Sequence, residues 1–286
     1  GSPETAVTVK QGLQNAAGGN VTYAATQSEA VSDMSSADAA VVVLGRGPGA
    51  EGPNDQRDPT LPADQQALVS ALKATGKPVI VVLIDDRPDA LGTAGNADAV
   101  LMAWRPGTQG GDGVADLLYG KVNPSGRLPV SWPTTSNDQP NSYRLTTLPG
   151  TGSDPAPAYP FGFGLSYTSY TSNVTAVSKA SGGVSVTVSA ANTGSKAGDL
   201  VVPVFVSQPV SAVLVPSKRL VGFTRVHLDA GQSTTVTVSV PDSALAVVQG
   251  DINAEGPPQV ESGQYVFSTG TAGAAPAATA GNSINL

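Results

Sequence analysis

The chain has 286 residues, of which 40% are hydrophobic and 13% are charged, so its length and apolar content predict two domains with separate cores. Its net charge of -7 and its lack of a basic patch argue against nucleic acid and anionic membrane surfaces as partners. With no cysteine and a single histidine, it is expected to hold no disulfide, thiol nucleophile or multi-histidine metal site, and a Ser-His-Asp triad is disfavoured.

The first half of the chain alternates between helix and strand patterns. The apolar run at 39–44 has no polar interruption, as expected for a strand that is buried on both faces. The alternation predicts an α/β domain over residues 1–135, with an open, mostly parallel sheet covered by helices. In chain order, the expected elements are a helix at 5–16, a strand at 21–24, a helix at 28–36, a strand at 39–44, a helix at 63–74, strands at 79–84 and 100–103, and a helix at 112–119.

A connection rich in Ser, Asn, Pro and Gly is expected over 136–165. Beyond it the pattern changes to the period-two alternation of half-buried strands. Short strands at this spacing predict an all-β sandwich of the fibronectin-III or immunoglobulin type over 166–270. The Ala- and Gly-rich residues 271–286 are expected to form a flexible tail. The strands are expected at 184–190, 200–206, 219–226, 233–240 and 264–268.

A Gly- and Pro-rich loop follows the strand at 39–44 and carries a lone glutamate, Glu51, four residues before Asp55. Ligands of open α/β sheets bind beside the loops that follow the carboxyl ends of the strands. A glutamate presented there is a candidate general acid/base. The alternative is that Glu51 is simply solvated, as a glutamate in such a loop usually is.

Several motifs, in a fixed order, resemble the C-terminal part of the family-3 glycoside hydrolases, which include β-glucosidases and exo-β-glucanases. Residues 1–168 carry AEGPND, KPVIVVL, AWRPGTQGGDGVADLLYGKVNPSGRLPVSWP and YPFGFGLSYT. The second half carries NTGSKAGDLVVPVFV and PSKRLVGFTRVHLDAGQSTTVTVSV, which are similar to the fibronectin-III-like domain that closes many of those enzymes.

In that family a barrel domain carries the nucleophilic aspartate and most of the sugar-binding residues. The α/β domain then lends the general acid/base glutamate from a loop whose pattern resembles GExPYxExxGD. Gly45, Pro48, Glu51 and Asp55 match that pattern here, so the resemblance implies that Glu51 is the acid/base. Trp104 ends a strand at the same edge, where it could stack on a sugar ring, although a tryptophan that packs the following loop is the alternative.

The chain departs from the family pattern in its loop. Arg46 stands where Glu is usual, Gly49 where Tyr is usual and Asn54 where Gly is usual, so the loop is expected to be looser or suited to another sugar. If Asp55 or Asp58 were the acid, the alignment would be shifted by a few residues.

A second departure is that no residues here match the barrel with its nucleophile motif, and the first strand of the α/β domain is expected to be missing. The isolated chain is therefore expected to be inactive and to need a family-3 barrel domain in cis or in trans.

These observations predict a retaining hydrolase of β-glucosides or β-linked oligosaccharides, with Glu51 as acid/base and with Trp104 and Asp55 in contact with substrate. No cofactor, metal, nucleic acid or membrane is expected. Two alternatives stay open: a non-catalytic carbohydrate-binding or interaction module, and a subunit that completes a site with a separate barrel chain. The acidic, cysteine-free composition is compatible with a secreted or periplasmic bacterial protein.

Overall fold

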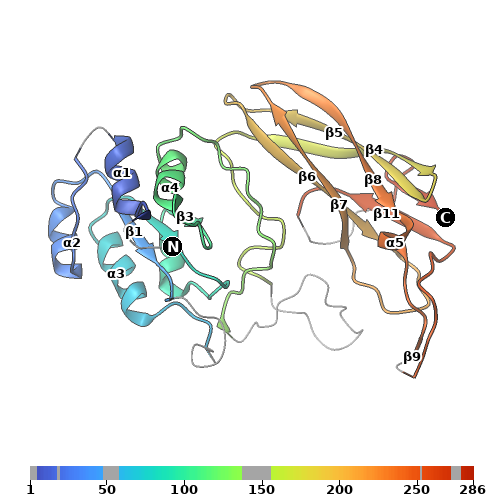
Figure 1. Cartoon of the computed structure of the whole chain (residues 1–286), viewed down its shortest axis with the longest axis horizontal. Coiled ribbons are helices and arrows are strands. Elements are labelled where there is room, and N and C mark those ends of the chain that lie inside the picture. Colours follow the sequence, from blue (N-terminus) through green and yellow to red (C-terminus); the bar gives the residue numbers. More distant parts are fainter. Residues whose placement is uncertain (1–4, 18–19, 48–57, 137–155, 252, 272–277) are drawn as a thin grey trace. The chain divides into compact units, whose positions relative to one another are not determined.

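The computed structural model describes residues 5–47 except 18–19, 58–136, 156–271 except 252, and 278–286. It divides into two compact units. The first comprises Gly1–Val122 and Trp132–Gln139, and the second comprises Asn123–Ser131 and Pro140–Leu286 (Figure 1). The stretch 123–131, which we assigned to the α/β domain, therefore groups with the second unit. Its backbone pairs there with the residues that precede the sandwich, since Leu128 N donates to Phe163 O at 2.8 Å.

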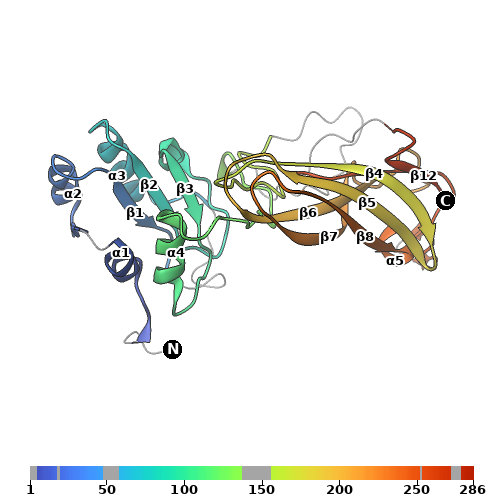
Figure 2. The same cartoon turned by 90° about the horizontal axis from the view of Figure 1, so that it is seen from above.

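The first unit is built on a parallel sheet with strand order β1-β2-β3, which confirms the predicted α/β class. Its helices cover both faces of the sheet, with α1 and α4 together on one face (Figure 2). The strands are β1 (Ala40–Leu44), β2 (Val79–Leu83) and β3 (Ala99–Met102). The helices are α1 (Val9–Ala17), α2 (Gln27–Asp33), α3 (Ala63–Lys73), η3 (Gly92–Asn96) and α4 (Gly110–Leu118).

Strand β1 is not buried on both faces, which corrects the expectation drawn from its apolar sequence. Val42 and Leu44 are buried, whereas Val41 is 36% exposed and Val43 is 47% exposed. Val41 and Val43 lie on the same face of this edge strand, so packing covers only the opposite face, which carries Val42 and Leu44.

Residues 21–24, which we predicted as a strand, form none. Val21 instead packs its side chain against the apolar cluster under α1 and α4. The apolar pattern therefore reports burial of a side chain there, without the backbone pairing that a strand requires.

Helices α1 and α4 cross so closely that their backbones touch. A Cβ atom on Gly12 would lie 2.0 Å from the carbonyl oxygen of Gly111, and a Cβ on Gly111 would lie 2.1 Å from that of Thr8. Around this contact Val9 and Leu13 pack with residues of α4. The absence of side chains at the two glycines thus sets the distance between the helices.

The second unit is a sandwich of two antiparallel sheets, with strand orders β12-β11-β6-β7 and β4-β5-β8, as the sequence predicts. Alternate residues of β5 and β6 point inward and form its core, for example Val186, Val188, Val202 and Val204. The strands are β4 (Tyr170–Ala180), β5 (Gly183–Asn192), β6 (Gly198–Ser207), β7 (Arg219–Leu228), β8 (Ser233–Pro241), β11 (Gln264–Ser268) and β12 (Ser283–Asn285). A short hairpin of β9 (Gly250–Asp251) and β10 (Ala254–Glu255) and the single turn α5 (Asp242–Leu245) complete the unit.

The end of the chain, expected as a flexible tail over 271–286, contributes strand β12 to this sandwich. Ser283–Asn285 pairs with β11. Ile284 and Leu286 pack against the sandwich core, and these apolar contacts anchor the end of the chain.

A carboxylate organises the connection between β6 and β7. Glu261 accepts hydrogen bonds from the side chains of Gln208 (2.6 Å), Ser211 (2.6 Å) and Gln249 (2.9 Å) and from the backbone N–H of Ala212 (3.0 Å). These bonds, with that of Ser211 the strongest, hold the pKa of Glu261 below its ordinary value of 4.5. The charged form of Glu261 therefore stabilises the connection.

The glycine contact predicts opposite effects for two substitutions in α4. Gly111→Ala is expected to lower the free energy of unfolding by about 1–3 kcal/mol, because the new methyl group would collide with the Thr8 carbonyl. Gly113→Ala is the control: a Cβ there meets nothing within 4 Å, so the helix should gain about 0.5–1 kcal/mol. Urea unfolding of both variants measures the difference, and equal effects would contradict the proposed close crossing.

The bonds to Glu261 predict a pH-dependent loss of stability in Glu261→Gln. A carboxyl group with a lowered pKa contributes stability above its ordinary value of 4.5, and this contribution is lost as the pH falls through the lowered pKa. The variant should therefore melt at a lower temperature than the parent at neutral pH, with a difference that shrinks in acid. Calorimetry alongside Glu255→Gln, an exposed glutamate of β10, checks this; a difference that stays constant with pH would count against it.

Candidate functional site

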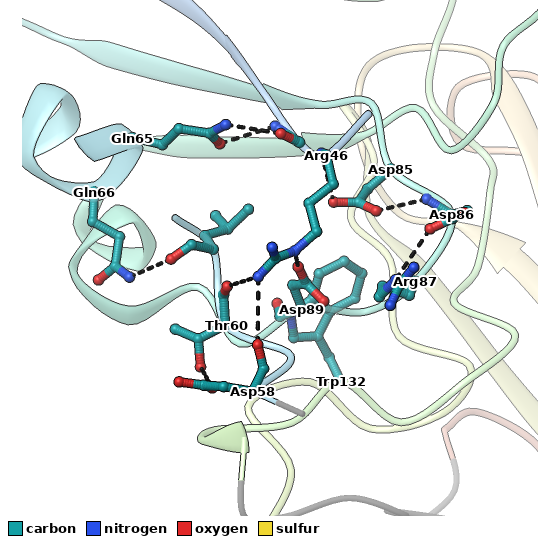
Figure 3. Close-up of polar contacts among 12 residues, drawn as sticks. Arg46, Asp58, Thr60, Gln65, Gln66, Asp85, Asp86, Arg87, Asp89 and Trp132 are labelled. Atoms are coloured by element: carbon teal, nitrogen blue, oxygen red, sulfur yellow. Dashed lines mark hydrogen bonds and ion pairs between the residues drawn. The ribbon is translucent and has the colours of Figure 1, made fainter. Parts of the chain in front are cut away.

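Polar residues of the first unit gather where its three parallel strands end. The strands run in the same direction, so the segments that follow them emerge at one edge of the sheet. Gly45 and Arg46 follow β1, the segment 85–89 follows β2, and Trp104 follows β3. Figure 3 shows the contacts of the residues that follow β1 and β2. This edge is the candidate site.

Arg46 is the centre of these contacts (Figure 3). Its Nε forms an ion pair with the carboxylate of Asp89, and one of its terminal nitrogens donates to the backbone oxygens of Thr60 and, at 3.4 Å, of Asp58. Its backbone N–H donates to the carboxylate of Asp85 at 3.1 Å. A single arginine thus connects the end of β1 with two other segments of the edge.

The residues next to these contacts are held by paired hydrogen bonds. The side-chain amide of Gln65, from α3, both donates to Gly45 O at 2.8 Å and accepts from Gly45 N at 3.0 Å. Further along the chain, Leu61 N donates to Ala90 O at 3.0 Å and Ala90 N donates to Pro59 O at 2.7 Å. The chain therefore leaves β1 bound to a helix and returns bound to the segment that follows β2.

Asp89 and Asp85 are carboxylates with little access to water. The Asp89 side chain is 2% exposed, and among the described residues its Oδ1 has no hydrogen-bond partner. Arg46 therefore balances a charge that solvent barely reaches. Burial raises the pKa of Asp85, with the nearby Asp89 carboxylate adding to the rise and a hydrogen bond from the Asp86 backbone opposing it.

Trp104 adopts a backbone conformation that is rare for any residue but glycine, with φ of 52°. Its half-buried ring lies 6.2 Å from that of Trp132, at an interplanar angle of 55°. Trp132 is buried and donates from its indole Nε1 to the backbone oxygen of Asp89 at 3.0 Å. The left-handed turn after β3 thus brings Trp104 to the edge at which Arg46 and Asp89 meet.

Comparison with known proteins decides the family. Residues 1–167 match the Glycosyl hydrolase family 3 C-terminal domain, and residues 200–272 match the Fibronectin type III-like domain. The chain belongs to glycosyl hydrolase family 3.

Its relatives in that family are longer enzymes. The chain is 37% identical to the periplasmic beta-glucosidase of Salmonella typhimurium over 76% of its own length and 31% of that protein. It is 35% identical to a beta-xylosidase of Formosa agariphila, over 85% of the chain and 35% of that protein. The chain thus spans about a third of the length of these curated relatives.

Solved structures of beta-glucosidases share its fold. The enzyme from Listeria innocua, in complex with gluconolactone, superposes with a TM-score of 0.83 at 26% identity, over 95% of this chain and 41% of that one. The enzyme from Erythrobacter marinus gives a TM-score of 0.80 at 30% identity, over 94% of this chain and 42% of that one.

Two of the residues that the sequence predicts for the site, Glu51 and Asp55, lie outside the described residues. Trp104 is described and lies at the predicted edge, although its contact with substrate stays a prediction. Asp58, the alternative acid, is poorly suited to that role because hydrogen bonds from Thr60 and Ser136 lower its pKa. A general acid needs the opposite shift.

Sequence reasoning missed the ion pair between Arg46 and Asp89. The available signal in the sequence is that Arg46 departs from the family pattern. No metal site accompanies the cluster: in the part of the chain that the structure describes, no three His, Cys, Asp or Glu side chains are grouped so as to hold a metal ion. Nor does any helix among those residues have the length and apolarity to cross a membrane.

The buried ion pair predicts strong coupling between its partners. Arg46→Met is expected to lower the free energy of unfolding of the first unit by about 3–5 kcal/mol, because it leaves the Asp89 carboxylate buried without a cation. Adding Asp89→Asn to this variant should recover part of that loss. The control is Arg105→Met, whose side chain is 57% exposed beside Asp86 and whose loss should cost less than about 1 kcal/mol.

Denaturant unfolding of the single and double variants measures this coupling. Additive losses in the double variant would contradict it, since independent residues show no interaction energy.

Proposed function

We propose that this chain supplies the acid/base half of a retaining β-glycosidase site, with Glu51 as the general acid/base. The nucleophile would come from a family-3 barrel domain, in cis or in trans. The observation that carries the proposal is that the residues flanking the Glu51 segment, Arg46 and Asp58, meet at the carboxyl edge of a parallel sheet. That edge is where an open α/β domain offers groups to a ligand.

Retaining hydrolysis needs two carboxyl groups about 5–5.5 Å apart on the two sides of the scissile bond. One attacks the anomeric carbon and forms a glycosyl-enzyme intermediate. The other protonates the leaving oxygen and then takes a proton from the water that releases the sugar. Placing them on different domains forms the pocket only when the domains meet, and the closed pocket would raise the pKa of the acid through desolvation.

The described carboxylates that follow β2 are engaged in other contacts, which supports an acid supplied by the segment that carries Glu51 and Asp55. Asp89 pairs with Arg46, and Asp86 pairs with Arg87 and Arg105. Asp85 has a raised pKa, but it is buried and both of its oxygens accept backbone N–H groups. None of them is free to protonate a substrate.

The proposed substrate is a β-glucoside or a short β-linked oligosaccharide, because the relatives are named as beta-glucosidases and a beta-xylosidase. Trp104 and Asp55 are proposed to contact it. Trp104 is partly exposed, so its ring offers an apolar surface suited to the apolar face of a sugar ring, and the buried ring of Trp132 lies beside it.

Hydrolysis of a chromogenic aryl β-glucoside tests the proposal. The isolated chain is expected to show no turnover, because it lacks the proposed nucleophile. Mixed with or fused to the barrel domain of a family-3 relative it should turn over, and Glu51→Gln should then reduce the rate by about 10²–10⁴-fold. The matched control is Glu255→Gln in the second unit, which should leave the rate unchanged.

Other outcomes identify the alternatives. Turnover by the isolated chain that Glu51→Gln abolishes would place a second catalytic carboxylate within these residues. No turnover with any barrel domain, despite formation of a complex, would favour a non-catalytic interaction module.

A further inference from the structure

One side chain connects the two ends of the segment that carries Glu51. The last described residues before it include Arg46, and the first described residues after it are Asp58 to Thr60. The guanidinium group of Arg46 donates to the backbone oxygens of Asp58 and Thr60 while it pairs with the Asp89 carboxylate (Figure 3). Arg46, just before the segment, is therefore hydrogen-bonded to the residues that directly follow it.

We propose that Arg46 is a positioning residue for the acid/base, which it orients by fixing both ends of this segment on Asp89. The inference rests on the proposed role of Glu51. Arg46 needs no contact with substrate in this role. Its effect reaches the reaction through the place and direction of the carboxyl group that protonates the leaving oxygen.

The anchor to which Arg46 binds is itself held by hydrogen bonds. The backbone oxygen of Asp89 accepts from the buried indole of Trp132, and the next residue, Ala90, pairs with the strand-like segment 59–61. The start of the segment is attached independently, since Gly45 makes two hydrogen bonds with Gln65 of α3. The first end is thus bound to helix α3, and the second end is bound to the segment that follows β2.

Arginine suits this task through its shape. The planar guanidinium offers five N–H donors in a fixed fork, so it can face a carboxylate and backbone oxygens in different directions at once. A lysine can keep the charge opposite Asp89, but its compact ammonium group cannot reproduce the fork. Arg46→Lys should therefore retain the ion pair and lose the fixed geometry of the returning segment.

Misplacement of an acid/base differs from loss of folding in its dependence on the leaving group. An alkyl β-glucoside has a basic leaving oxygen that must be protonated in the transition state, whereas a dinitrophenolate leaves without a proton. Loss of folding reduces the concentration of active enzyme and so lowers both rates by the same factor. Impaired acid catalysis lowers only the first.

The experiment uses the chain joined to a family-3 barrel domain. Two variants change Arg46. One is Arg46→Lys, and the other is the double variant that combines Arg46→Met with Asp89→Asn and so leaves no unpaired charge at this position. Both are compared with Glu51→Gln. Lys73→Met is the control, because Lys73 also pairs with an aspartate, Asp98, and that aspartate binds the first residue of β2 rather than a residue of the site. For each variant kcat/KM is measured on an alkyl and on a dinitrophenyl β-glucoside.

The expected result is a fall of about 10²-fold in kcat/KM for the alkyl glucoside in both Arg46 variants, with less than about a tenfold change for the dinitrophenyl glucoside. Azide should raise kcat for the dinitrophenyl substrate in these variants. It attacks the anomeric carbon, displaces the enzyme carboxylate and gives a glycosyl azide, so no base is needed to activate water. Lys73→Met should behave as the parent.

Equal losses on both substrates, without rescue by azide, would overturn the proposal in favour of a purely structural role. Parent-like rates on the alkyl glucoside would overturn it as well. In either case Glu51→Gln would still show the leaving-group dependence, so the role of Glu51 would stand. If Glu51→Gln lacked that dependence, both the proposed function and this inference would be overturned.

Discussion

The carboxylate of Asp89 is almost fully shielded from water, and among the described residues Arg46 is the cation that balances it. An isolated charge in such a place is costly, so the ion pair constrains every segment that contributes to it. The end of β1 must lie where Arg46 reaches Asp89, and the segment 58–60 must offer its backbone oxygens to the same guanidinium. The carboxyl edge of the sheet is organised around this requirement.

Each unit is stabilised by interactions of its own. In the first unit the contact between Gly12 and Gly111 lets α1 and α4 pack as one layer over the sheet. In the second unit the alternating valines of β5 and β6 form a separate core, and the charge of Glu261 organises the connection after β6. The two units depend on different interactions, so a substitution in one is not expected to unfold the other.

Among the described residues, the carboxyl groups that follow β2 have structural partners and are poorly suited to acid/base chemistry. Asp85, Asp86 and Asp89 are all engaged by arginines or by backbone N–H groups. Such engagement holds a carboxyl group in one protonation state, whereas an acid/base must change state twice in each catalytic cycle. We propose Glu51 for that task.

Local patterns in the sequence determined the elements and their class. The helix at Ala63–Lys73, the strand at Val79–Leu83 and the alternation of β5 follow from side-chain spacing, Pro and Gly, and the order of motifs indicated the family. The tertiary structure decided what depends on which segments meet. Only it showed that Val41 and Val43 are exposed on an edge strand, that Ser283–Asn285 completes a sheet, and that Arg46 pairs with Asp89, which lies 43 residues away. Spacing reports the periodicity of one segment, but burial and ion pairing require a neighbour, and only folding selects that neighbour.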